Sequence, residues 1–198
     1  MALDSDGLVV IPGVTSHFVR LSDGSKAHYS TSGHDGPAVI LCHGGLPGSS
    51  GIAGFRHALP FLGANGFRVY APDFPGFGWA DNREEYWSRL GSVGHVDFIQ
   101  RFADALCLDQ FSITGNSMGC ASTLNYTLAH PERVKNFILL AGTVGDIVDP
   151  SLKIPRGFQT NTHFLKLKHR GNIYFSYFLY FCILQSRAKA NRKLLSSV

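Results

Sequence analysis

The stretch from Phe111 to Ser122 reads FSITGNSMGCAS and contains the pattern G-x-S-x-G, with Ser117 at its centre. This pattern puts a serine on a strained turn between a strand and a helix. Such a serine is usually a nucleophile that attacks a carbonyl carbon and gives its proton to a histidine. The motif therefore predicts acyl-transfer chemistry at Ser117, although a plain strand-to-helix turn can have the same pattern.

A second glycine turn, His43-Gly44-Gly45, follows the apolar run PAVILC. An acyl-transfer site needs N–H donors for the oxyanion, and the loss of one donor raises the barrier by about 3–4 kcal/mol. Where a serine sits on such a turn, one donor is the amide after it and the other comes from the loop after the third strand. We therefore expect the amides of Met118 and Gly45 to be these donors, because glycine lets the backbone approach a substrate closely.

Apolar patterns around the two turns predict the elements that position them. A hairpin is expected around Asp23-Gly24. The predicted strands are 37–44, 67–73, 111–115 and 134–142, and the predicted helices are 54–66, 92–107 and 117–130. Strands that alternate with helices favour an α/β fold, with a mostly parallel sheet covered by helices on both faces. Both glycine turns then lie at the C-terminal ends of strands, where such sheets form active sites.

The charge of the chain changes sharply near residue 150. Residues 1–150 contain 9 Lys/Arg and all 14 Asp/Glu, whereas residues 151–198 contain 9 Lys/Arg and no acid, which gives the net charge of +4. We therefore divide the chain into an enzyme-like part, 1–150, and a basic, aromatic tail, 151–198. The apolar run Ile173–Leu184 in this tail has 12 residues. It is too short to cross a bilayer as a helix, which takes about 20 residues, although a helix lying on a membrane surface is conceivable.

Several classes of partner are not expected. The four cysteines have neither metal nor disulfide spacing, and Cys42 and Cys120 near the two turns are interpreted as small buried thiols. The N-terminus lacks a signal-peptide pattern, which favours a cytoplasmic location. We expect a small-molecule substrate, with no nucleic-acid or membrane partner, no metal and no organic cofactor.

Three stretches, VILCHGGLPGSSG, FRVYAPDFPGFGWAD and ITGNSMGCASTLNYTLAHPERVKNFILLAG, together resemble the α/β-hydrolase superfamily. Within it they are similar to the meta-cleavage product hydrolases, which cut carbon–carbon bonds in ring-opened aromatic compounds. The resemblance covers residues 16–145. It implies a nucleophile, Ser117, oxyanion-hole amides from Gly45 and Met118, and two residues beside the substrate, Gly44 and Asn116.

The sequence departs from this family in three respects. The segment Ile52-Ala53-Gly54 stands where the meta-cleavage hydrolases often have Trp-x-Asn, which removes a polar substrate contact. Cys120 stands where a further glycine is common. The family's acid and histidine would follow strands that lie beyond Val198. The expected fold is therefore an incomplete α/β-hydrolase fold that lacks the last strands, with an exposed sheet edge through which the chain could self-associate.

Other residues were considered as a replacement base or acid. His130 lies in the helix-end sequence AHPERV and is expected to be structural, and His43 is expected to brace its loop. His163 and His169 lie in the basic tail and remain open as bases. Asp146 follows the strand at 134–142, but without a histidine it is interpreted as a loop acid.

The predicted function is a serine hydrolase that acts through Ser117 on a C–C bond of a ring-cleavage product or on a carboxylic ester, with impaired activity in this chain. One alternative is a non-catalytic ligand-binding module, since a fold of this kind can hold a ligand once its triad is broken. Another is a non-functional truncated fragment whose tail replaces the true C-terminal half. A hydrolysis assay separates the first two readings, and limited proteolysis reveals the third.

Overall fold

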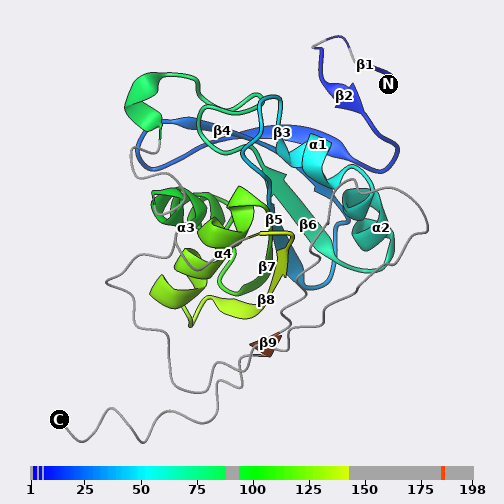
Figure 1. The fold of residues 1–198 in the computed structure, drawn as a ribbon. Helices are drawn as coiled ribbons and strands as arrows, with labels where there is room; N and C mark the ends of the chain where they lie inside the picture. The colour runs from blue at the N-terminus through cyan, green and yellow to red at the C-terminus, as the bar shows by residue number, and fades with distance from the viewer. Residues whose placement is uncertain (1, 4, 6, 88–93, 143–183, 186–198) are drawn as a thin grey trace, which may run out of the picture.

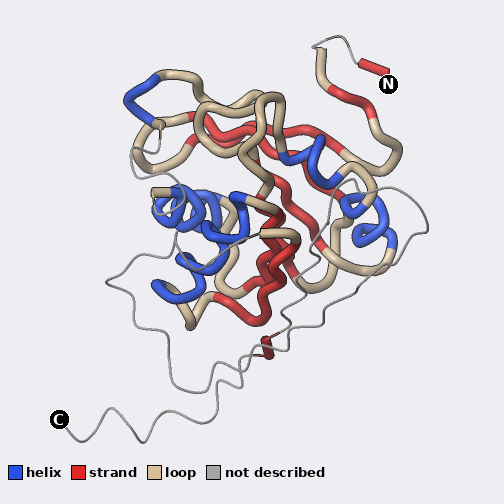
Figure 2. The backbone as a smooth tube through the Cα atoms, viewed as in Figure 1, coloured by secondary structure: helices blue, strands red, loops and turns tan. Residues whose placement is uncertain are grey.

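The computed structural model describes residues 2, 3, 5, 7–87, 94–142, 184 and 185 of the 198-residue chain (Figure 1). Helices lie on both sides of a central sheet in this part of the chain, as the tube in Figure 2 shows. A short N-terminal sheet pairs β1 (Ala2–Leu3) with β2 (Val9–Val10). The sequence patterns did not predict this small sheet.

The main sheet has seven strands in the order β3-β4-β6-β5-β7-β8-β9. They are β3 (Thr15–Arg20), β4 (Lys26–Ser32), β5 (Ala38–Cys42), β6 (Arg68–Pro72), β7 (Phe111–Asn116), β8 (Val134–Leu140) and β9 (Leu184–Gln185). Strands β6, β5, β7 and β8 are parallel, whereas β3, β4 and β9 pair antiparallel with their neighbours. The predicted parallel sheet after an opening hairpin is confirmed.

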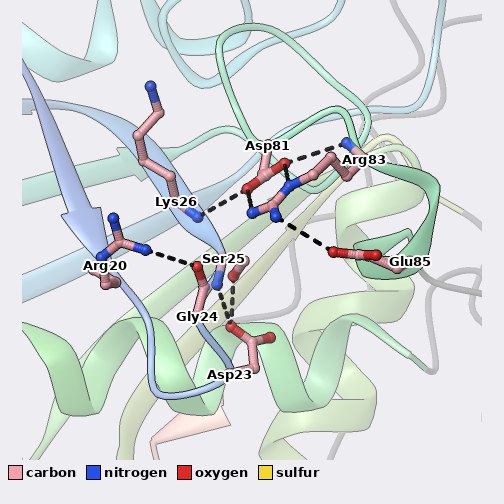
Figure 3. Close-up of polar contacts among 8 residues, drawn as sticks. All are labelled: Arg20, Asp23, Gly24, Ser25, Lys26, Asp81, Arg83 and Glu85. Carbon is pink, nitrogen blue, oxygen red and sulfur yellow. Dashed lines mark hydrogen bonds and ion pairs between the residues drawn. The ribbon is translucent and has the colours of Figure 1, made fainter.

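The opening hairpin is β3 and β4, which pair from Thr15 opposite Thr31 to Arg20 opposite Lys26. The carboxylate of Asp23 closes the turn, because one of its oxygens accepts hydrogen bonds from the amide of Ser25 at 3.0 Å and from its hydroxyl at 2.6 Å (Figure 3). The strong turn signal in the sequence therefore gave the position of this hairpin correctly.

The loop after β6 is fastened to this hairpin by a group of polar contacts (Figure 3). The guanidinium of Arg83 donates two bonds to the carboxylate of Asp81, Nε to Oδ1 at 2.9 Å and Nη2 to Oδ2 at 2.7 Å. The amide of Asp81 donates to the carbonyl oxygen of Lys26 at 3.0 Å. The bonds from Arg83 hold the pKa of Asp81 well below its usual range. Because Arg83 is exposed, we expect the pair to orient the loop more than it stabilises the fold.

Helices cover both faces of the sheet. They are α1 (Gly51–Phe55), α2 (Ala58–Ala64), α3 (His95–Ala105) and α4 (Met118–Ala129), with a short 3-10 helix η1 (Glu84–Tyr86) in a loop. Val39 and Leu41 of β5 pack into the core under α1 and α2, whereas Ile40 and Cys42 pack into the larger core under α3 and α4. Figure 1 shows the two helix pairs on opposite sides of the strands. A strand buried on both faces has a continuous apolar sequence, as AVILC does.

The single helix predicted over residues 54–66 is wrong. The structure instead has α1 from Gly51, a break at Arg56 and His57, and then α2. Pro60 gives the physical reason, because in a continuous helix its ring would clash with the carbonyl of Arg56. The break places Pro60 in the first turn of α2, where a missing N–H leaves no bond unmade.

The outer edge of β8 is predicted to lack a partner, and the structure corrects this for two residues. β9 pairs antiparallel with β8, with Gln185 opposite Asn136 and Leu184 opposite Phe137. The predicted basic tail over 151–198 otherwise lies outside the described residues, as does the Ile173–Leu184 run up to its last residue. The domain boundary near residue 150 therefore stays a prediction.

Cys107 follows α3 in the left-handed conformation, with φ 53°. The amide of Leu108 donates to the carbonyl of Ala103 at 2.9 Å and the amide of Cys107 to that of Asp104 at 3.0 Å. These two bonds form a Schellman motif, in which this left-handed position favours glycine. We expect Cys107→Gly to raise the free energy of unfolding in urea by about 0.5–1 kcal/mol. Cys107→Ser keeps the backbone cost and is the control, and a loss of stability in Cys107→Gly would contradict the assignment.

Candidate active site

Ser117 lies between the last residue of β7 and the first residue of α4. Its backbone has φ 53° and ψ −116°. Such a conformation costs a non-glycine residue on the order of 1–3 kcal/mol and is typical of functional sites. Ser117 is exposed, whereas its neighbours in β7 and α4 are partly or fully buried. The sharp strand-to-helix turn that the G-x-S-x-G pattern predicts is present.

The two glycines of this pattern are required by the close approach of backbone segments. A Cβ on Gly115 would overlap the carbonyl oxygen of Gly119. A Cβ on Gly119 would overlap the carbonyl oxygen of Cys42, at the end of β5, and lie 2.7 Å from its carbonyl carbon. The glycines therefore let the first turn of α4 pack directly on the ends of β7 and β5.

The second glycine turn lies against the first. A Cβ on Gly44 would stand 3.3 Å from the Cβ of Ser117, and a Cβ on Gly45 would stand 3.3 Å from the Cβ of Met118. The side-chain amide of Asn116 donates to the carbonyl of Leu140 at 3.3 Å, so it ties β7 to the end of β8. The structure thus gathers all five predicted site residues: Gly44, Gly45, Asn116, Ser117 and Met118. Their roles toward an oxyanion or a substrate stay predictions.

His43 supports the second glycine turn, His43-Gly44-Gly45, through hydrogen bonds of its ring, as the sequence predicts. Its Nε2 accepts a hydrogen bond from the backbone amide of Phe74 at 2.9 Å, so Nδ1 carries the proton and donates to the carbonyl of Gly44 at 2.6 Å. Burial lowers the pKa of His43, which keeps the ring neutral. A protonated ring could not accept from Phe74, so the neutral form is also the one that fits the geometry.

Asp73 holds the far end of the same loop, a role that the sequence analysis missed. One carboxylate oxygen accepts from the amide of Gly51 at 2.7 Å, and the other accepts from the amide of Trp79 at 2.9 Å. The ring Nδ1 of His28, on β4, lies 2.8 Å from that second oxygen. The carboxylate thus joins the start of α1, the loop after β6 and the hairpin. Its position at the C-terminal end of the predicted strand 67–73 was a signal that could have identified it.

His95, on the first turn of α3, is a second residue that the sequence analysis missed. It is 3% exposed, and its Nδ1 lies 2.9 Å from the hydroxyl of Ser122, one turn beyond the start of α4. Its ring stacks on Phe74 with centroids 4.0 Å apart and planes 9° apart. The ring is therefore part of the packing between α3, α4 and the loop after β6. The helical apolar spacing around it gave no sign of a buried histidine.

We expect His95 to make the stability of the protein depend on pH. Burial, with a smaller contribution from repulsion by His43, lowers its pKa from 6.5 to about 4. Because the unfolded chain binds this proton first, the stability due to the neutral ring is complete above pH 6.5 and is lost between pH 6.5 and 4. The loss is on the order of 3 kcal/mol. Urea unfolding of the wild type and of His95→Asn, which cannot titrate, should differ in slope over this range, and equal slopes would refute the assignment.

A sequence model of the alpha/beta hydrolase fold family matches residues 37–193. The chain belongs to this family. It is 36% identical over 144 residues to the 2-hydroxy-6-oxononadienedioate/2-hydroxy-6-oxononatrienedioate hydrolase 1 of Pseudomonas putida. The matched region covers 71% of this chain and 50% of that protein. It is 35% identical over 130 residues to a 2-hydroxy-6-oxo-6-phenylhexa-2,4-dienoate hydrolase of Burkholderia cepacia, which covers 64% of this chain and 44% of that protein.

Solved structures of this alpha/beta hydrolase family agree with the observed fold. A meta-cleavage product hydrolase from Pseudomonas fluorescens IP01 superposes with a TM-score of 0.59 at 33% identity, over 64% of this chain and 44% of that one. The 2-hydroxy-6-oxo-6-phenylhexa-2,4-dienoate hydrolase of Rhodococcus sp. strain RHA1 gives a TM-score of 0.58 at 34% identity, and the match covers 66% of this chain and 47% of that one. The resemblance to meta-cleavage hydrolases is therefore confirmed, and the chain spans about half the length of the relatives it matches.

No histidine among the described residues is hydrogen-bonded to the Ser117 hydroxyl. The buried rings of His28, His43 and His95 are bonded to Asp73, to the carbonyl of Gly44 and to Ser122, respectively. His130 lies beyond the far end of α4, where its ring contacts Tyr126, so its structural interpretation fits. Two predicted candidate bases, His163 and His169, and the acid Asp146 lie outside the described residues.

The thiols of Cys42 and Cys120 are fully buried, as the sequence predicts. Burial raises the pKa of Cys120 to about 11, so neither nucleophilic thiolate chemistry nor metal binding is expected there at neutral pH. The described residues contain no group of three or more His, Cys, Asp or Glu side chains that could hold a metal ion. The same part of the chain contains no helix long and apolar enough to span a membrane.

Proposed function

We propose that this chain is a serine hydrolase of the alpha/beta hydrolase family in which Ser117 is the nucleophile. The observation that carries the proposal is the exposed, strained Ser117 with the Gly44–Gly45 turn packed against it. A serine held in this way can reach a carbonyl carbon, while backbone amides on either side can bind the oxygen that becomes negative. The amides assigned to this oxyanion hole are those of Gly45 and Met118.

In the proposed reaction the Ser117 hydroxyl oxygen bonds to the substrate carbonyl carbon and its proton passes to a base. The oxyanion then re-forms the carbonyl and breaks the bond to the leaving group, an alkoxide for an ester or a carbon for a ring-cleavage product. The leaving group takes the proton, and water later releases the acyl group from Ser117. We assign Gly44 and Asn116 to positions beside the substrate in this reaction. The names of the relatives support a keto-dienoate acid as the substrate class, and the acyl-transfer chemistry of a serine nucleophile supports a carboxylic ester as the alternative.

The described residues of this site include no base for the Ser117 proton, and we propose that the hydrolase activity is impaired for this reason. The same observation supports a second candidate function, a ligand-binding module that holds such a small molecule without turning it over. In either case the proposed setting is the cytoplasm, and no metal or organic cofactor takes part.

Chemical rescue with imidazole tests the proposed function. Imidazole can replace a missing histidine as a base, so the hydrolysis of 4-nitrophenyl acetate by the full chain should rise with imidazole concentration. Ser117→Ala in the same imidazole solutions is the matched control, because it corrects for catalysis by free imidazole. If both proteins respond equally, Ser117 is not the nucleophile. Saturable binding of a keto-dienoate with no rescue would favour the binding module.

We also propose that the chain associates with itself through the outer edge of β8. Among the described residues, β9 pairs with Asn136 and Phe137, and no strand pairs with residues 138–140 on the same side of β8; an uncovered strand edge of this kind can pair with another chain. Light scattering after size-exclusion chromatography should show a mass that rises with concentration. A monodisperse monomer with a sharp, cooperative melt would contradict self-association, because it would mean that the rest of the chain covers this edge.

A further inference from the structure

The carbonyl oxygen of Leu140, the last residue of β8, accepts hydrogen bonds from three groups of the serine turn. The backbone amide of Ser117 donates to it at 3.0 Å, the side-chain amide of Asn116 at 3.3 Å, and the thiol of Cys120 lies at 3.2 Å. Three donors from five consecutive residues therefore meet on one acceptor. The conformation of Ser117 is in this way tied to the end of the neighbouring strand.

The thiol of Cys120 joins the ends of two strands. Its sulfur is 3.2 Å from the carbonyl of Leu140 on β8 and also 3.2 Å from the carbonyl of Gly115 on β7. The side chain is fully buried, and its thiol stays protonated at neutral pH, so it is a donor to either oxygen. No other side chain of the turn reaches both carbonyl groups among the described residues.

The backbone after β8 passes close to the Cys120 thiol and leaves space for it. Ala141 has a left-handed backbone with φ 52°, and the chain then passes over Cys120 at Gly142. A Cβ on Gly142 would overlap the sulfur of Cys120 and would lie 2.5 Å from its Cβ and 2.7 Å from the carbonyl oxygen of Ser117. Gly142 thus leaves the space that the Cys120 thiol fills, because a larger residue at position 142 would overlap it.

We propose that Cys120 is a positioning residue for Ser117: its thiol links the ends of β7 and β8 and so keeps the Leu140 carbonyl on the Ser117 amide. This amide belongs to the residue with the strained backbone, and strain of this kind persists only where surrounding contacts hold it. Without the thiol, the end of β8 can move away and the turn can relax. The consequence for the rate of hydrolysis rests on the proposed function, whereas the consequence for the backbone does not.

Amide hydrogen exchange of the full chain tests the backbone part directly. In Cys120→Ala, exchange at the Ser117 amide should rise by about 3- to 10-fold, the effect of losing one net hydrogen bond. Cys120→Ser keeps a donor and should stay within about twofold of the wild type. Cys42→Ala removes an equally buried thiol from β5 and is the matched control, so it should leave this amide unchanged.

Imidazole-rescued ester hydrolysis supplies a second readout for the same variants. Cys120→Ala should lower kcat by about 3- to 10-fold with KM nearly unchanged, because the substrate still binds while the nucleophile is misplaced. If the wild type shows no rescue, the proposed function fails but the exchange measurement still decides the role of Cys120. Unchanged exchange in Cys120→Ala, or an equal rise in Cys42→Ala, would overturn the proposal, since the thiol would then act only through packing.

The size relation with Gly142 gives an independent check if Cys120→Ala folds poorly. Gly142→Ala should raise exchange at the Ser117 amide more than Cys120→Ala does, because it pushes the thiol away and crowds the Ser117 carbonyl. The double change Cys120→Gly with Gly142→Ala relieves the clash with the thiol and should restore part of the protection. Unchanged exchange at the Ser117 amide in Gly142→Ala would contradict the proposed link.

Discussion

Without added imidazole, the 198-residue chain should hydrolyse 4-nitrophenyl acetate only slowly, at no more than about 10³–10⁴ times the rate in water. This residual rate comes from substrate binding and from the oxyanion hole. It is low because an alcohol without a base is a weak nucleophile. For the same reason Ser117→Ala should lower this residual rate by less than about tenfold. The measurement is the initial rate of nitrophenolate release by both proteins in one buffer.

Rapid turnover that disappears in Ser117→Ala would contradict this expectation and would mean that the chain contains a working base. His163→Ala and His169→Ala would then identify it, since these are the candidate histidines outside the described residues. The buried His43 and His95 are poor candidates, because both are already bonded elsewhere and burial lowers the pKa of each ring, which makes it a weak proton acceptor.

Gly119→Ala should destabilise the protein by about 3 kcal/mol or more, at the upper end of the range for overpacking. The added methyl would overlap the carbonyl of Cys42, and the backbone of β5 cannot turn aside as a flexible side chain could. Either β5 or the first turn of α4 must shift, so the rescued hydrolysis should fall as well. Urea unfolding at neutral pH measures the change.

Gly54→Ala is the matched control for this variant. Its Cβ would stand 3.5 Å from the Cβ of His43, an ordinary contact, and the residue lies in helix α1. Alanine favours a helix over glycine by about 1 kcal/mol, so this variant should be unchanged or slightly more stable. If Gly119→Ala loses no more stability than Gly54→Ala, α4 does not pack on β5 as described.

The sequence predicted the elements around the site well because their patterns are local. The turn at Asp23-Gly24, the apolar run of β5 and the G-x-S-x-G motif each identify a backbone geometry from neighbouring residues. The predicted helix over 54–66 is wrong because the apolar pattern does not include the clash of the Pro60 ring with the carbonyl of Arg56, although this clash is also local.

The supporting contacts could not be predicted from local patterns. The pairs Asp73 with His28, His95 with Ser122 and Cys120 with Leu140 join residues that are 20 to 45 positions apart in sequence. Nothing near His95 in sequence distinguishes a buried ring from an exposed one. Similarly, the need for Gly142 appears only when the end of β8 is seen to pass over Cys120.

The most direct test of the central claim is an amide spectrum of the ¹⁵N-labelled chain with an arylboronic acid. A boronate bonded to Ser117 is tetrahedral and places an oxygen where the oxyanion would form, about 3 Å from both donors. The account predicts that the amide signals of Gly45 and Met118 shift together on titration, and that neither shifts in Ser117→Ala. If the two signals stay in place, or shift equally in Ser117→Ala, these amides do not form an oxyanion hole for this serine.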